Sequence, residues 1–509
     1  MFDTGLPDVG ELAGADENLV VAAIAGWASI EAAAAARRLA AIAELVARRI
    51  DGPEYSRWTC DGWDATAAEV GAALHVSHGK ASGQMYLAAA LHQRLPKVAE
   101  AFAEGMLSAA LVATIAWHTT LIQDPEALAL ADKSLAADAL RYGPLSAAKT
   151  AAAIDAIVDR YDPGALRRTR SSARSRDLVV DSADSESGTT PLWGRLYAAD
   201  AEALDRRLMA MAHQVCDDDP RTIAQRRADA LGALAAGGQR LVCGCGDAEC
   251  PAAAAGDQPS GVLIHVVADP AALAVPVDPH HDGEGPPPAP ITAEGVLTQA
   301  PHPEPDPPAV TGPPAQILGG PIICAPLLAE LVRTGAKVKP LRFPAGSPPE
   351  PGYRPSTALD EFVRCRDMTC RFPDCDRPAE FCDLDHTIPY GVGGLTHPSN
   401  LKCLCRKHHL LKTFWGWQDK QLPDGAVIWT SPSGQTHTSY PGSRLLFPRL
   451  CLPTGELPCP TPPQQRSGDR TLMMPLRKRT RAQNRNQAIN AERALNDAHV
   501  AERNRPPPF

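Results

Sequence analysis

Cysteines and histidines crowd into one short segment near the carboxyl end of this 509-residue chain. Six of the fourteen cysteines fall between Cys365 and Cys405. The chain does not begin with a basic stretch followed by an apolar core, so we expect no secretory signal. The cysteines are therefore read as reduced thiols or metal ligands rather than as a disulfide framework. A metal site in this segment would constrain its fold more strongly than any other feature of the sequence.

Two pairs of ligands in this segment have spacings typical of tetrahedral zinc. One pair of cysteines has four residues between its members and lies on a predicted turn, and the second pair is one helical turn apart. Thiolate and imidazole are ligands that zinc prefers, and metal binding would stabilise a segment poor in large apolar residues. Cys382 and Cys403 lie close enough to compete for the fourth position. The predicted ligands of a structural Zn²⁺ are Cys370, Cys375, Cys405 and His408.

A second set of polar side chains in the same segment suits the hydrolysis of a phosphodiester. Neighbouring residues on a helix point about 100° apart, so His409 can serve a different metal from His408. Asp385 and His386 face opposite sides if they lie on a strand, unless the proline and glycine turn after them distorts its end. We predict a divalent cation held by Asp385 and His409, with neutral His386 taking a proton from water. The alternative is that these groups are only surface or supporting polar residues.

The order of these motifs resembles the HNH endonuclease module, a ββα-metal fold also called the His-Me finger. The shared pattern is a pair of cysteines, "DH", a Gly-Gly turn, "SNL" and "CRKHH". The resemblance implies His386 as general base and Asp385 and His409 as ligands of a catalytic Mg²⁺, Mn²⁺ or similar cation. It also implies that Asn400 fixes the loop and orients the base. Many such modules have a cysteine where this chain has His408, which gives a zinc set of three cysteines and one histidine.

Alanine and leucine at helical spacing dominate the first half of the chain. The pattern covers residues 15–236 and predicts a mainly helical domain. Residues 67–91 have the rhythm of a helix-turn-helix, but their second helix offers few cations for a phosphate backbone. We therefore favour an ordinary helical hairpin over a DNA-reading motif. The side chains that could read DNA are His78, Lys80, Gln84 and His92.

A second cysteine cluster, "CGCGDAEC", follows the helical segment. It places Cys243, Cys245 and Cys250 within eight residues, and His265 comes shortly afterwards. Three thiols and an imidazole could close a small zinc site, although no fourth ligand lies at a standard spacing. Reduced surface cysteines are the other interpretation. The sequence leaves both open.

Changes in composition divide the chain into five parts. We expect a multidomain protein with a mainly helical domain and a small α/β portion over residues 15–275, then a proline-rich linker or insertion over 276–314. Residues 315–355 should hold a short helical segment and a second proline-rich stretch. The ββα-metal HNH module and a following β-hairpin are expected over 356–450, where "PDG" and "PSG" mark turns. Residues 451–509 form a basic tail that is expected to be flexible or helical.

This arrangement resembles the actinobacterial 13e12 repeat proteins, in which an alanine-rich helical domain of unknown function precedes an HNH module. The signals are the helical first half, "GVLIHVV", "RCRDMTCRFPDC" and the turn-rich segment after the module. The resemblance covers most of the chain and implies no activity for the first domain.

The formal net charge of −9 argues against a surface that is basic throughout. DNA contacts would have to come from Arg406, Lys407 and Lys412 near the metal, from the basic tail, or from the five arginines within residues 167–176. A solvated tail and a solvated charged loop are the alternatives for the last two. No run of about 18 uncharged apolar residues occurs, so we expect a soluble, cytoplasmic protein without membrane contact.

The leading hypothesis is a metal-dependent DNA endonuclease of the HNH class. One alternative is a non-catalytic, zinc-stabilised DNA-binding protein or regulator, and another is a zinc-stapled module that binds proteins. The adjacent Asp385 and His386 favour the first hypothesis, because a structural zinc site does not need them. The sequence does not indicate an oligomeric state.

Overall fold

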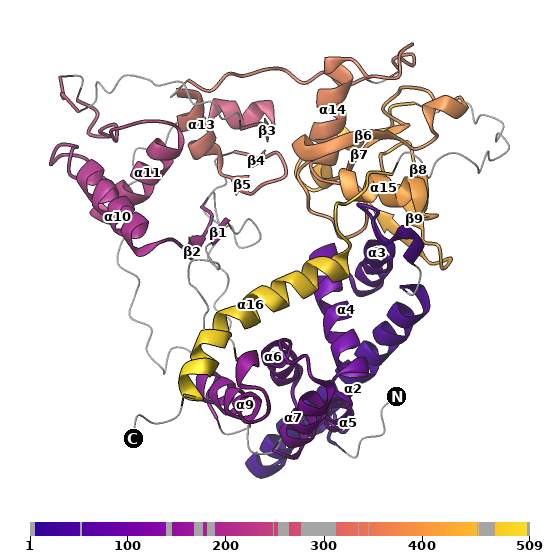
Figure 1. Cartoon of the computed structure of the whole chain (residues 1–509). Helices are drawn as coiled ribbons and strands as arrows, with labels where there is room; N and C mark the ends of the chain where they lie inside the picture. The colour runs from indigo at the N-terminus through magenta and orange to yellow at the C-terminus, as the bar shows by residue number, and fades with distance from the viewer. Residues whose placement is uncertain are drawn as a thin grey trace.

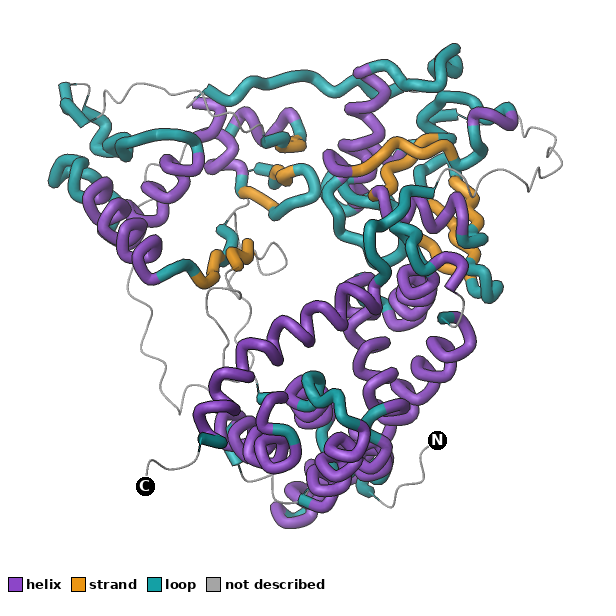
Figure 2. Tube along the Cα trace, viewed as in Figure 1, coloured by secondary structure: helices purple, strands orange, loops and turns teal. Residues whose placement is uncertain are grey.

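The computed structural model divides into a helical bundle, a region with two small cores and a compact carboxyl-terminal module (Figure 1). Helices account for most of the regular structure, and the strands form short sheets (Figure 2). The predicted multidomain architecture with a mainly helical first part is thus confirmed. The structure describes residues 6–50, 53–138, 145–166, 177–180, 189–247, 249–252, 264–275, 312–333, 335–344, 346–455, 457 and 474–505.

The helical bundle is built from capped, alanine-rich helices around an aliphatic core. Serine or aspartate side chains accept hydrogen bonds from the first turns of most of these helices, which satisfies backbone groups that would otherwise lack partners. Met85, Phe102 and Ile154 are fully buried in the core. After the short α1 (Val9–Leu12), the bundle helices are α2 (Glu17–Arg49), α3 (Gly62–Leu74), α4 (His78–Gln93), α5 (Pro96–Ala103), α6 (Ala109–His118), α7 (Pro125–Ala137) and α9 (Ala147–Tyr161).

α3 and α4 form the helical hairpin that the sequence predicts. His75, in the left-handed conformation with φ of 53°, ends α3, and Ser77 caps α4. α4 buries Ala81 and Met85 in the bundle core. His78 Nε2 lies 3.1 Å from Asp64 Oδ1, so this side chain is engaged inside the protein. α3 and the start of α4 therefore pack inside the protein in this structure.

α2 is the one described helix that is long and apolar enough to cross a membrane, by length and composition alone. Its second half supplies Ala36, Leu39 and Val46 to the bundle core. Towards its beginning, Val21 and Ile24 are exposed. The expectation of a cytoplasmic location stays a prediction.

The basic tail is helical where the structure describes it and packs on the bundle. α16 (Arg481–Arg503) crosses one side of the bundle (yellow in Figure 1). Arg493 Nη1 lies 2.7 Å from Asp162 Oδ2, and Asn496 Nδ2 donates to the carbonyl of Gly164 at 2.8 Å. The arginines of this helix are therefore partly neutralised by the protein's own carboxylates.

The middle of the chain forms two small units. One combines α10 (Ala198–Ala212) and α11 (Ile223–Ala235), and the other is an antiparallel sheet with the strand order β3–β4–β5 covered by α13 (Ala325–Arg333). Strands this short carry too few residues for a clear alternation, so the sequence did not reveal β4 and β5. Most of the proline-rich segment 276–314 lies outside the described residues. The remaining strands here are β1 (Asp177–Val180), β2 (Leu192–Arg195), β3 (Val266–Ala268), β4 (Ala315–Ile317) and β5 (Ile322–Ile323).

The carboxyl-terminal module has a β-hairpin followed by a helix and a second sheet. β6 and β7 are antiparallel, with Cys382 opposite Cys405 and His386 opposite Leu401. The second sheet has the order β10–β9–β8, so the "PDG" and "PSG" turns join three strands where the sequence predicted one hairpin. The elements are α14 (Thr357–Asp367), β6 (Cys382–His386), β7 (Leu401–Cys405), α15 (Arg406–Phe414), β8 (Gln418–Gln421), β9 (Val427–Thr430) and β10 (Thr436–Ser439).

A buried ion pair connects α14 to this hairpin. Arg366 Nε donates to Asp367 Oδ1 at 2.8 Å, and its two terminal nitrogens donate to the carbonyls of Pro398 and Leu401 at 2.7 Å each. Asp367 Oδ2 accepts from the backbone N–H of Cys403 at 2.8 Å. Each nitrogen of the guanidinium and each oxygen of the carboxylate has a hydrogen-bond partner, which offsets the cost of burying the two charges. The pair fixes where β7 begins.

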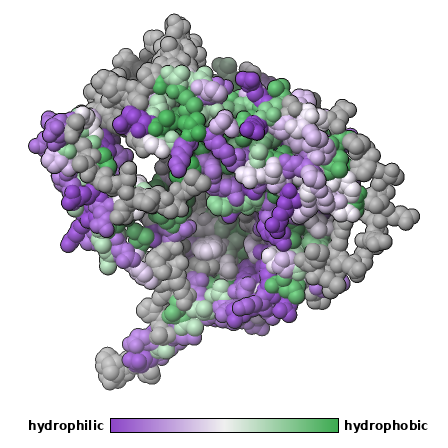
Figure 3. Space-filling view, turned by 90° about the horizontal axis from the view of Figure 1, so that it is seen from above, coloured by the Kyte–Doolittle hydropathy of each residue, from purple (hydrophilic) through white to green (hydrophobic). Residues whose placement is uncertain are grey.

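The bundle and the module share an interface that also includes the tail. Trp415 Nε1 donates to the carbonyl of Cys60 at 3.0 Å, and Trp58 packs edge-on against Phe414 and Trp415. Seen from above, hydrophilic and hydrophobic residues are interspersed over the surface (Figure 3). The buried carboxylate of Asp64, in α3, lies at the centre of the polar part of this interface. Its partners are His78, Lys407, Arg477 and Arg481.

Replacing both Arg477 and Arg481 by glutamine should loosen the tail from the bundle. Asp61 and Asp64 are buried and would lose two cationic partners, at a cost of about 1–3 kcal/mol. Hydrogen exchange in α16 should become about tenfold faster or more. Arg479→Gln is the matched control, since in the described part of the chain Arg479 bonds to Gln487 on the surface and not to the bundle. Equal protection of α16 in the double variant and the control would contradict this docking.

Candidate functional site

Four predicted zinc ligands meet at the start of α15. The ligand atoms of Cys370, Cys375, Cys405 and His408 all lie within 4.8 Å of one another. His408 Nδ1 is 3.3 Å from Cys405 Sγ and 3.5 Å from Cys370 Sγ. Cys405 ends β7 and His408 lies in the first turn of α15, so the cluster joins the turn of residues 370–375 to both elements. Three thiols and an imidazole in this arrangement could hold a metal such as zinc.

The surroundings of this cluster favour the thiolate form of Cys405 and hold the imidazole of His408 in place. Hydrogen bonds from the thiols of Cys370 and Cys375, together with His408, lower the pKa of Cys405. Burial raises the pKa of Cys370 well above its usual range. The ring of Phe372 stacks on His408 with 4.1 Å between centroids, which holds the imidazole in place. A zinc ion would complete this group by stabilising the deprotonated thiols.

The two competing cysteines lie outside this group. The Cys382 thiol is directed at backbone carbonyls and donates to Pro378 at 3.4 Å. Cys403 is fully buried in the core of the module. The geometry thus places His408 in the fourth position.

His409 points away from that cluster and towards two aspartates of β6. Its Nδ1 lies 2.8 Å from Asp383 Oδ2, and its Nε2 lies 3.5 Å from Asp385 Oδ1. Because the ring donates from Nδ1 to Asp383, a neutral imidazole presents its lone pair at Nε2 to Asp385. A cation with bonds of about 2.1 Å spans two ligand atoms that are about 3–3.5 Å apart. Asp385 Oδ1 and His409 Nε2 therefore have the separation that a shared divalent cation needs.

The other oxygen of Asp385 is occupied by two ammonium groups. Asp385 Oδ2 lies 2.8 Å from Lys402 Nζ and 2.6 Å from Lys412 Nζ, and both lysines also contact Asp419. Burial opposes ionisation of Asp385, but Lys402, Lys412 and His409 outweigh it and lower the pKa to about 2. The carboxylate is therefore ionised at neutral pH. Its Oδ2 contacts the two lysines, and its Oδ1 faces His409.

His386 lies on the opposite face of β6 from Asp385. Its Nε2 is 2.9 Å from the hydroxyl of Thr396, and that hydroxyl donates its only proton to the carbonyl of Gly352 at 2.6 Å. The imidazole must then donate from Nε2, which leaves the lone pair on Nδ1. Burial lowers the pKa of His386, Lys402 and Lys412 lower it further, and Asp385 opposes them. Tyr353 stacks on the ring with 5.3 Å between centroids.

Asn400 fixes the loop that follows β6. Its Oδ1 accepts from the N–H of Ile388 at 2.8 Å, and its Nδ2 donates to the carbonyls of Ile388 and Leu395 at 3.1 and 2.8 Å. Gly394 approaches the Ile388 carbonyl so closely that a Cβ would collide with it. Three hydrogen bonds from one buried amide thus hold the two ends of this loop together.

The cations predicted to contact DNA have different environments. Arg406 is largely exposed, with Nη1 3.5 Å from Asp383 Oδ2. Lys407 is about half exposed and lies 3.3 Å from Asp64 Oδ1. Lys412 is turned inward to Asp385 and donates to the carbonyl of His386 at 2.8 Å. The arginines of residues 167–176 lie outside the described residues.

A second thiol group lies in the middle of the chain. Cys243, Cys245 and Cys250 are joined there by Cys216, and the four sulfur atoms lie within 4.8 Å of one another. His265 is not part of this group, because the fourth member comes from the segment between α10 and α11. The fourth cysteine of this group, Cys216, therefore lies upstream of the other three. Its distance from them in the sequence is too long for motif spacing to reveal it.

Sequence reasoning also missed several residues around Asp385. Asp383 is two positions before it on the same face of β6, so strand alternation could have found it. Lys402 is its partner across the hairpin, which needs the register to be known. Asp419 comes from the second sheet, and Thr396 from the loop, and no local pattern marks either of them.

The fold and the site define the chain as a multidomain protein in which a helical bundle carries a cysteine- and histidine-rich ββα module. It belongs to the family with a domain of unknown function, DUF222, whose model matches residues 28–367. The match ends at the last residue of α14 and so precedes the cluster of Cys370, Cys375, Cys405 and His408.

Similar proteins occur in Mycobacterium tuberculosis. The uncharacterized protein Rv2100 of strain H37Rv is 58% identical over 515 residues, covering 100% of this chain and 93% of the relative. The uncharacterized protein Rv3776 is 56% identical over 510 residues, covering 100% of this chain and 95% of the relative. No solved structure matches the chain.

The two adjacent histidines of α15 should respond differently to substitution. His408→Ala should remove one zinc ion per chain, because it deletes a ligand of the cysteine cluster. His409→Ala should leave the zinc content unchanged, because this side chain faces Asp383 and Asp385. Elemental analysis of the purified variants measures both. Loss of the same ion from both variants would contradict the assignment.

Proposed function

We propose that the chain is a metal-dependent endonuclease of the HNH class that hydrolyses phosphodiester bonds in DNA. The observation that carries the proposal is the pair Asp385 Oδ1 and His409 Nε2, which are 3.5 Å apart. Asp385 directly precedes His386, the last residue of β6. A structural zinc site alone would not require this pair. The order β6, β7, α15 is also that of a ββα-metal module.

His386 is the proposed general base. The contact with Thr396 leaves Nδ1 free to accept a proton from water, and the lowered pKa keeps the ring neutral near pH 7. Asn400 is a positioning residue in this scheme. It closes the loop immediately after His386 and so fixes the end of the strand on which the base lies.

Asp385 and His409 are the proposed ligands of the catalytic cation. When bound, a divalent cation stabilises the charge that develops on the phosphate and on the leaving oxygen. Asp383 holds the ring of His409 so that Nε2 faces Asp385. Lys402 and Lys412 hold Asp385 through its other oxygen, which keeps Oδ1 directed at His409.

DNA would meet this site mainly through exposed cations. Arg406 lies beside Asp383 on the open side of α15 and is the best placed to contact a phosphate. Lys407 could do so only in competition with Asp64, and Lys412 only in competition with Asp385 and Asp419. We therefore expect weak, salt-dependent binding by the module itself.

A non-catalytic, zinc-stabilised DNA-binding protein is the second candidate. Two observations favour it: Tyr353 covers the ring of His386, and two ammonium groups already neutralise Asp385. A binding protein needs neither a free base nor a cation site. The two candidates differ in whether the protein cleaves DNA. An endonuclease should lose cleavage when His386 is replaced, whereas a binding protein should bind DNA without cleaving it.

A plasmid assay separates the candidates. The purified chain with Mg²⁺ or Mn²⁺ should convert supercoiled plasmid to nicked or linear DNA, and His386→Ala and His409→Ala should each lower the rate by about a hundredfold or more. His437→Ala is the control, because His437 lies in β10 and takes no part in the site. Zinc content should be the same in all four proteins.

Two outcomes would overturn the proposal. One is a wild-type protein that holds its zinc and leaves DNA intact with every divalent cation tried. The other is cleavage that survives unchanged in both histidine variants, since the activity would then arise elsewhere or from a contaminant.

A further inference from the structure

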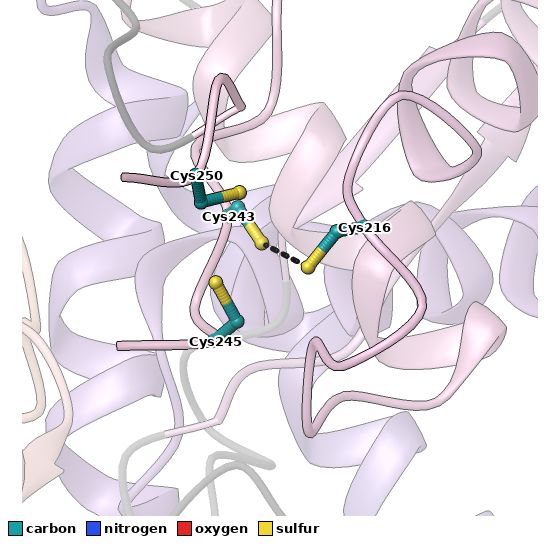
Figure 4. A group of neighbouring side chains, drawn as sticks. All are labelled: Cys216, Cys243, Cys245 and Cys250. Carbon is teal, nitrogen blue, oxygen red and sulfur yellow. Dashed lines mark hydrogen bonds between the residues drawn. The ribbon is translucent and has the colours of Figure 1, made fainter. Parts of the chain in front are cut away.

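The cysteine group in the middle of the chain is built by two separate segments. Cys216 follows α10, whereas Cys243, Cys245 and Cys250 lie in the loop after α11. In Figure 4 all four sulfur atoms point into the same small space, with Cys216 facing the other three. The four Sγ atoms lie within 4.8 Å of one another, and Cys216 Sγ is 3.4 Å from Cys243 Sγ.

The backbone around these thiols is held in a fixed turn. Gly246 has φ of 77°, a conformation that favours glycine, directly after Cys245. The N–H of Gly244 donates to Asp219 Oδ2 at 2.8 Å, and the N–H of Cys243 donates to the carbonyl of Ala252 at 3.1 Å. Asp219 is in turn held by Arg221 Nη2 at 2.7 Å. The loop is thus braced from the segment that carries Cys216.

We propose that Cys216, Cys243, Cys245 and Cys250 form a second structural zinc site. Tetrahedral zinc with Zn–S bonds of about 2.3 Å places its sulfur ligands about 3.8 Å apart, which matches thiols that converge on one point. Two disulfides would instead need two pairs of sulfur atoms about 2 Å apart. Four thiolates and no other ligand make a closed site, which is typical of a structural role.

The unit around these thiols has little else to stabilise it. Its core contains few large side chains, and two of the cysteines belong to that core. A bound metal would link the segment after α10 to the loop after α11. This link would add to the stability that the small apolar core provides. The buried residues of this core are Leu208, Met211, Val215, Ala230, Leu241, Cys243 and Cys250.

Zinc counting on the full-length chain tests this site. Reduced wild-type protein should hold two zinc ions, one in each group. Cys216→Ser and Cys375→Ser should each hold one, and the double variant none. Cys324→Ser is the control and should hold two, because Cys324 belongs to neither group. Cys216→His should keep the second ion, since imidazole is also a zinc ligand.

Hydrogen exchange locates the ion that is lost. Cys216→Ser should speed exchange within residues 198–252 and leave residues 370–412 protected, whereas Cys375→Ser should do the reverse. A Cys216→Ser variant that holds as much zinc as the wild-type chain would overturn the proposal, whatever the occupancy of the other group. The proposal would also be overturned if these four cysteines formed two disulfides that persist under mild reduction. None of these results depends on whether the protein cleaves DNA.

Discussion

The direction of α15 depends on the cluster of Cys370, Cys375, Cys405 and His408. The side chain of His408 points into that cluster. Neighbouring residues of a helix point about 100° apart, so the side chain of His409 must point to another side of α15. That side faces β6, where Asp383 and Asp385 lie. One histidine therefore supports the fold and the next one faces the polar site, and moving the first would misplace the second. The structural cluster and the candidate site are coupled through a single peptide bond.

Charge balance governs the polar site beside that cluster. The carboxylates of Asp385 and Asp419 share the ammonium groups of Lys402 and Lys412, and Asp383 contacts the ring of His409 beside them. The lysines lower the pKa of Asp385 to about 2 and so keep it ionised although it is buried. They also hold only one of its oxygens. This division explains how the same carboxylate can be stabilised by lysines and still offer an oxygen towards His409.

Local patterns could be predicted from the sequence, and contacts between distant segments could not. The cluster around His408, the divergence of His409 and the loop held by Asn400 follow from residues within one short segment, because chain geometry limits where they can go. Cys216 escaped because it is 27 residues from Cys243 and lies in the segment between α10 and α11. The docking of α16 escaped because it depends on where the bundle places Asp61, Asp64 and Asp162. Asp419, in β8, shares Lys402 and Lys412 with Asp385 only because the two sheets pack together.

The central claim is that Asp385 and His409 share a divalent cation. Anomalous diffraction from crystals of the zinc-loaded chain soaked in Mn²⁺ tests it most directly. We predict a manganese peak within bonding distance of Asp385 Oδ1 and His409 Nε2, with Lys402 and Lys412 still on Oδ2, and no such peak in His409→Ala. The claim would be contradicted by a wild-type map that shows zinc at the cysteine clusters but no manganese between these two atoms. The Mn²⁺ concentration in the soak should be at least the one at which the protein cleaves DNA.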